Sequence, residues 1–149
     1  MGMAKRHEAR TAAVQLLFQN DYNPVALDEA FATFWAQRRA DDEVRRFTEE
    51  LVRGVLAHQA EIDPLSQQCA DNWQLRRMAG VDRNIIRLAV YEMLHHADIP
   101  PAVSINEAVE TAKSLSDCSS GRFVNGVLDR VRKVLNRSAR GTSPDGATS

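Results

Sequence analysis

The stretch VDRNIIRLAVYEML (Val81–Leu94) decides the fold of this chain. Its apolar residues are not confined to one stripe but cover most of a helix circumference: Ile85, Ile86, Leu88, Ala89, Val90, Met93 and Leu94. A helix that is apolar on most of its sides is buried in the middle of a protein. The stretch therefore predicts a central helix around which the other segments pack.

The next segment, DIPPAVSINEAVETAK (Asp98–Lys113), predicts a turn followed by a second helix. Pro100 and Pro101 cannot continue the preceding helix, and they favour extended backbone. Ser104 and Glu107 have the spacing of a capping box, in which two side chains satisfy the free amides at a helix start. Apolar residues at helical spacing follow, so we expect this helix to begin near Ser104.

The segment FVNGVLD (Phe123–Asp129) lies in the last expected helix, which reaches about Leu135. A polar joint at residues 116–120 precedes it, and its apolar residues again repeat with the helical period. Residues 138–149 hold no large apolar side chain. They cannot bury enough surface to offset the entropy lost on ordering, so we expect a disordered tail.

The first half of the chain shows the same helical period. Its apolar spacing and helix breakers predict helices over Ala4–Asp21, Leu27–Arg38, Asp41–Leu56 and Ile62–Ala70, with a hinge at Asn72 and Trp73. Because the period-two alternation of strands is missing, we predict an all-α protein with about six to seven helices in two packed bundles. We expect one domain over residues 1–137, with bundles over about 4–70 and 75–137.

Composition limits the function further. The 149 residues carry a formal net charge of −1, so a site for nucleic acid must come from local clustering of cations. No apolar run is long enough to span a bilayer, and the N-terminus lacks a signal-peptide core, so we expect no membrane partner. Cys69 and Cys118 lie far apart without a CxxC spacing, which favours two free thiols in a reducing cytoplasm.

Cations crowd the first turns of the opening helix, at Lys5, Arg6 and Arg10, with His7 beside them. The helix dipole is positive there, so each nearby cation costs about 0.3–1 kcal/mol. A phosphate ligand is one explanation for such a placement, and a solvated basic end is the other. Arg6 and Arg10 lie four residues apart and share a face, which we expect to point outward.

The three C-terminal segments, in this order and spacing, resemble the NusB family of bacterial transcription antitermination factors. The run AVQLLF (Ala13–Phe18) and the basic opening support the resemblance, which covers roughly Lys5 to Leu135. The resemblance implies an all-helical RNA-binding protein. The family's arginine-rich N-terminal segment corresponds here to Lys5, Arg6, His7 and Arg10, although Glu8 interrupts it with a negative charge.

The resemblance also implies contacts elsewhere. The joint before the last helix is a second RNA contact in the family, which points to Ser119, Arg122 and Phe123. Phe123 also fits the apolar stripe of a core. The positions that match a contact with the partner NusE, a small-subunit ribosomal protein, are Phe18 and Asp82. A core role for Phe18, and helix-dipole stabilisation by Asp82, are the alternatives.

We therefore expect a cytoplasmic antitermination factor that binds single-stranded boxA-type RNA together with NusE and promotes ribosomal RNA transcription by RNA polymerase. An RNA-binding module related to ribosomal RNA methyltransferases is an alternative, but the chain leaves no room for a cofactor-binding domain after Leu135. A homodimer that masks its RNA site is another.

Catalysis is not expected, since the sequence has no catalytic or phosphate-loop motif. We predict no cofactor and no metal site. The adjacent His95 and His96 point about 100° apart on a helix, so they cannot chelate one ion together.

Overall fold

The computed structural model describes residues 1–70 and 74–141, with the side chains of 139–141 left out. Its elements in chain order are α1 (Met3–Tyr22), α2 (Leu27–Ala36), α3 (Asp42–Ala57), α4 (Gln59–Cys69), a short 3-10 helix η1 (Leu75–Arg77), α5 (Gly80–His95), α6 (Pro101–Leu115) and α7 (Cys118–Gly141). The described residues contain no strand, so the all-α prediction is confirmed. The hinge expected at Asn72 and Trp73 lies outside the described residues.

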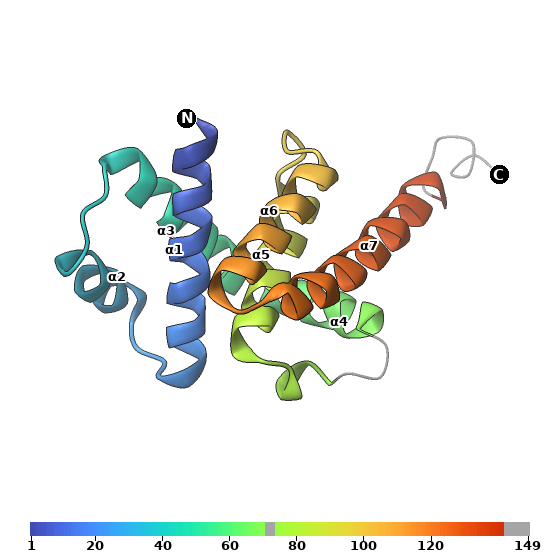
Figure 1. The fold of residues 1–149 in the computed structure, drawn as a ribbon, viewed down its shortest axis with the longest axis horizontal. Coiled ribbons are helices and arrows are strands. Elements are labelled where there is room, and N and C mark those ends of the chain that lie inside the picture. Colours follow the sequence, from blue (N-terminus) through green and yellow to red (C-terminus); the bar gives the residue numbers. More distant parts are fainter. Residues whose placement is uncertain (71–73, 142–149) are drawn as a thin grey trace.

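α5 is the central helix, as its sequence predicts. It packs against α1, α3, α4, α6 and α7, and Figure 1 shows it in the middle of the molecule, with α1 to α3 to its left and α7 to its right. Ile86 and Val90 have no exposed surface. Three polar side chains of α5 are also buried, Asn84, Arg87 and Glu92, and each must find a partner inside the protein.

One hydrophobic core runs through both halves of the chain. It joins apolar residues of α1 and α3 to those of α5, α6 and α7, and α4 packs on α5 and α7 as well as on α3. The two bundles therefore share a continuous interior. The boundary between them, expected near residue 70, stays a prediction. None of the helices in the described part of the chain has the length and apolarity needed to cross a bilayer.

Two helices begin just after an aspartate whose side chain caps the first turn. Asp41 caps α3, since its Oδ1 accepts a hydrogen bond from the Val44 amide at 3.0 Å. Asp117 does the same for α7, with its Oδ1 accepting from the Ser120 amide at 2.7 Å. α4 begins at Gln59, three residues before the expected Ile62.

The capping box expected at Ser104 and Glu107 is wrong. α6 begins at Pro101, whose fixed φ suits the first helical position and whose missing N–H is no loss there. Ser104 and Glu107 therefore lie inside the helix. Ser104 donates its hydroxyl hydrogen to Glu92 at 3.0 Å, and Glu107 contacts His7, so both side chains make tertiary contacts.

α7 is longer than expected at both ends. It begins at Cys118, within the expected polar joint, and continues to Gly141. The expectation of a disordered tail is therefore wrong for residues 138–141, which are helical. Residues 142–149 lie outside the described residues.

Candidate nucleic-acid interface

The start of α1 carries two exposed cations, Lys5 and Arg6. The Lys5 ammonium lies 2.9 Å from an Asp41 oxygen and 3.5 Å from a Glu43 oxygen, at the beginning of α3. The hydrogen bond to Asp41, together with the two negative charges, raises the pKa of Lys5. Within the described part of the chain, Arg6 makes no ion pair. At the N-terminus of α1, Arg6 is therefore open to an anion without competition from an acid of the protein.

Arg10 does not point outward, and that expectation is wrong. Its side chain is 5% exposed, and its Nε and Nη2 each donate a hydrogen bond of 2.9 Å to Glu92 of α5. Arg10 precedes the buried Ala13 and Val14 by three and four residues, so it lies on the face of α1 that packs against the core. In this position the guanidinium is covered by the protein and paired with Glu92.

His7 is tied to α6. Its Nδ1 lies 2.9 Å from Glu107 Oε2, and its side chain is 43% exposed. The structure thus divides the four predicted residues: two are exposed, one is half-exposed and held by an acid, and one is buried. Their roles in RNA binding stay predictions, but the basic end is smaller than the sequence suggests.

The second predicted RNA segment lies at the start of α7. Ser119 and Arg122 are exposed. Phe123 is half-buried and packs against the core, and its contact with RNA stays a prediction. Ser119 and Phe123 line a cleft of about 410 Å³ together with Asp82 of α5. The Ser120 hydroxyl donates a hydrogen bond to Asp82, which joins the starts of α5 and α7.

Phe18 lies against the start of α5. A Cβ added to Gly80 would come within 2.9 Å of the Phe18 ring, so the glycine permits this close approach. The ring of Tyr22 lies 4.9 Å from that of Phe18, and Tyr22 is 73% exposed. Tyr22 is not among the predicted contact residues, although its position one helical turn after Phe18 could have indicated it.

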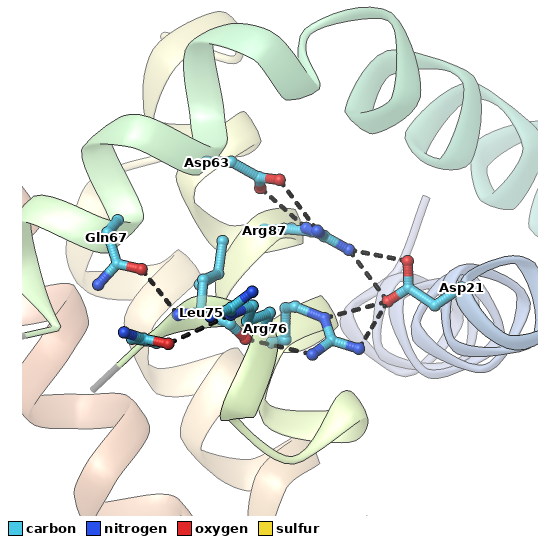
Figure 2. Close-up of a pocket in the computed structure, with 8 residues that line it drawn as sticks. Asp21, Asp63, Gln67, Leu75, Arg76 and Arg87 are labelled. Atoms are coloured by element: carbon cyan, nitrogen blue, oxygen red, sulfur yellow. Dashed lines mark hydrogen bonds and ion pairs between the residues drawn. The ribbon is translucent and has the colours of Figure 1, made fainter.

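A network of charged residues around Arg87 was also not predicted from the sequence (Figure 2). Arg87 donates from Nε and Nη2 to Asp63 of α4 and from Nη1 to Asp21 of α1, at 2.8–3.1 Å. Burial lowers the pKa of Arg87, but the hydrogen bonds and charges of Asp63 and Asp21 raise it more. Arg83 and Arg76 line the same cleft of about 720 Å³. The network fixes α1 and α4 to α5.

These features define a class: small all-helical proteins of two packed bundles, with exposed cations at the start of one helix and a polar cleft at the start of another. The comparisons with known proteins then identify the family. The NusB family model matches residues 7–133. The transcription antitermination protein NusB of Desulforapulum autotrophicum is 45% identical over 136 residues, which are 90% of this chain and 95% of that protein. The chain belongs to the NusB family.

Solved structures agree with this assignment. T. maritima NusB is 36% identical with a TM-score of 0.74, covering 86% of this chain and 90% of that one. A structure of the antitermination factors NusB and NusE in complex with double-stranded RNA gives a chain 26% identical, with a TM-score of 0.80, covering 89% of this chain and 99% of that one. The all-helical arrangement of two packed bundles is thus the fold of the family.

Proposed function

We propose that the chain is a transcription antitermination factor that binds single-stranded boxA-type RNA together with NusE. It joins the antitermination complex on RNA polymerase in the cytoplasm and promotes transcription of ribosomal RNA. Family membership supports the antitermination role, and the similarity to NusB in a complex with NusE and double-stranded RNA supports NusE and RNA as partners. The mechanism is assembly, in which no bond is made or broken.

The observation that carries this proposal is the exposed pair Lys5 and Arg6 at the N-terminus of α1. Cations at this end oppose the helix dipole, whereas a bound phosphate would satisfy both the cations and the free amides. Lys5 must leave Asp41 and Glu43 to meet a phosphate. Exposed ion pairs of this kind contribute little to stability, so RNA can displace them.

The second contact is the start of α7, with Ser119, Arg122 and the exposed part of Phe123. α6 separates the two contacts, because His7 lies beside Glu107 and α7 follows the end of α6 at Leu115. The axial rise from Glu107 to Leu115 is about 12 Å. An RNA strand that uses both contacts has to pass over α6.

The surface for NusE comprises Phe18 and Asp82, extended by Tyr22. An exposed aromatic ring next to a half-buried one offers the kind of anchor that protein interfaces use. Asp82 lies both on this side of α5 and in the cleft with Ser119. Contacts with NusE and with RNA would thus meet at the start of α5, which gives a physical route for one to strengthen the other.

Fluorescence anisotropy with a labelled boxA-type RNA of about 12 nucleotides tests the proposal. Arg6→Glu should weaken RNA binding at least tenfold, whereas Arg137→Glu, an exposed arginine near the far end of α7, should leave it nearly unchanged. Tyr22→Ala should reduce the gain in affinity that NusE gives, with RNA binding alone little affected, because Tyr22 lies outside the cleft of Ser119 and Phe123. Equal binding by the two arginine variants would show that the RNA site lies elsewhere.

A second variant distinguishes a phosphate contact by Lys5 from a merely basic surface. Glu43→Gln removes one of the two acids that hold the Lys5 ammonium, so it should raise RNA affinity about two- to threefold at low salt. Asp28→Asn is the control, because it frees Arg53 by removing an exposed acid elsewhere on the surface. Equal gains in the two variants would point to net charge alone and contradict a contact by Lys5.

A further inference from the structure

Two histidines and a glutamate meet where α3, α4 and α5 come together. His58 is the single residue between α3 and α4, Glu61 lies in the first turn of α4, and His95 ends α5. One possible ligand atom from each lies within 4.8 Å of the other two. The three side chains come from positions up to 37 residues apart in the chain, so their spacing shows no metal motif.

We propose that His58, Glu61 and His95 bind a divalent transition-metal ion of the Zn²⁺ class. Two imidazoles and one carboxylate are the protein ligands of many zinc sites, with water in the fourth position. Since Glu61 and His95 are partly exposed, water has access to complete the coordination. This site is independent of the RNA-binding proposal.

The geometry needs only side-chain adjustment. His95 Nε2 already lies 2.8 Å from Glu61 Oε1, and the rings of His58 and His95 stack with centroids 3.9 Å apart. A tetrahedral ion with bonds of about 2.0–2.1 Å places its ligand atoms about 3.3 Å apart. Bringing atoms now up to 4.8 Å apart to that spacing requires rotations about side-chain bonds that open the stack of His58 and His95, so that both rings turn a nitrogen toward the ion.

The backbone around the cluster is already fixed. The His58 amide donates to the Gly54 carbonyl at 3.1 Å, and its own carbonyl accepts from the Glu61 amide at 2.9 Å. Its ring also stacks on Tyr91 of α5, with centroids 5.9 Å apart. The backbone of His58 and Glu61 is thus fixed before an ion arrives, so only side-chain freedom is lost on binding. A bound ion would tie the junction of α3 and α4 to the end of α5.

Titration calorimetry with Zn²⁺ on the full, untagged chain tests the proposal. A Cys118→Ser background removes the exposed thiol, which is a competing soft ligand. The expected result is one equivalent bound, with affinity reduced at least tenfold by His95→Ala and by Glu61→Gln. His96→Ala is the matched control, because it removes a neighbouring histidine outside the cluster and should bind like the parent protein.

The melting temperature provides a second test of zinc binding. Zn²⁺ should raise the melting temperature of the parent and of His96→Ala but not that of His95→Ala or Glu61→Gln. If His95→Ala loses its helical circular dichroism, the exposed Glu61→Gln decides the matter. Absence of binding by the parent at submillimolar Zn²⁺, or parent-like binding by Glu61→Gln, would overturn the proposal. Either result is expected if His95 and Glu61 make only a structural contact and bind no ion.

Discussion

Among single residues, Arg10 and Glu92 form an ion pair that is almost completely buried. Each charge removed from water costs several kcal/mol, which is offset only while both partners and their hydrogen bonds are present. Ser104 supplies a further hydrogen bond to Glu92. We expect Arg10→Met to lower the free energy of unfolding by about 3–5 kcal/mol, since it leaves the Glu92 carboxylate buried and unpaired. Urea unfolding with an unchanged m value measures the loss.

Two further variants control this prediction. Arg10→Met with Glu92→Leu removes both charges, so it should recover most of the lost stability. Arg53→Met removes a half-exposed arginine that pairs with the exposed Asp28, and it should cost at most about 1 kcal/mol. Wild-type stability in Arg10→Met would contradict the structural role given to this ion pair.

At the scale of elements, Asp21 holds the end of α1 to the start of α5. Its Oδ2 accepts from Asn84 at 2.8 Å and lies 3.1 and 3.0 Å from the guanidinium nitrogens of Arg83 and Arg87. Burial raises the pKa of Asp21, but the hydrogen bond from Asn84 and the charges of Arg87 and Arg83 lower it more. The folded-state pKa therefore lies below the ordinary value of 3.8.

This direction fixes a pH dependence. A carboxyl whose pKa is lower in the folded state stabilises the fold above its unfolded pKa and loses that contribution as pH falls through the folded value. Asp21→Asn should cost about 1–2 kcal/mol at pH 7, a charge-assisted hydrogen bond discounted for partial exposure. The difference from wild type should shrink below about pH 4 in urea unfolding. Asp28→Asn is the exposed control, and a gap that is equal at pH 3 and pH 7 would contradict the prediction.

The elements themselves follow from the sequence because their signals are local. The apolar period of 81–94 predicts α5 to within a residue at each end, and the expected span of α1 is also within a residue of Met3–Tyr22. The start of α6 was misjudged, because Ser104 and Glu107 fit a capping box as well as they fit two tertiary contacts. Spacing alone cannot separate these cases.

The predicted site was only partly accessible to sequence reasoning, and for the same reason. Arg10 is an exposed cation or a buried one depending on Glu92, which lies 82 residues away in the chain. The acids that hold Lys5 and His7 likewise come from other helices. His58 and His95 meet only because α3 packs on α5. Residues far away in the sequence decide whether a charged side chain is free to bind RNA or an ion. No local sequence pattern indicates which residues these are.

At the scale of the whole molecule, the charges nearly cancel. The chain has 19 lysines and arginines against 20 aspartates and glutamates, so its overall field offers RNA no long-range attraction. Ionic contributions to RNA binding must then come from the few cations that contact phosphates directly. The structure leaves Lys5, Arg6 and Arg122 exposed for this role, while Arg10 is withdrawn into the core.

The salt dependence of RNA binding measures the number of these phosphate contacts. Each phosphate of a single strand that a cation neutralises contributes about −0.7 to the slope of log K against log salt, so three contacts give about −2. Arg6→Gln should reduce the steepness by about 0.7, whereas Arg137→Gln should leave the slope unchanged. Anisotropy titrations at several salt concentrations measure both values. A slope of about −4 or steeper would require cations beyond these three, and an unchanged slope in Arg6→Gln would remove the N-terminus of α1 from the interface.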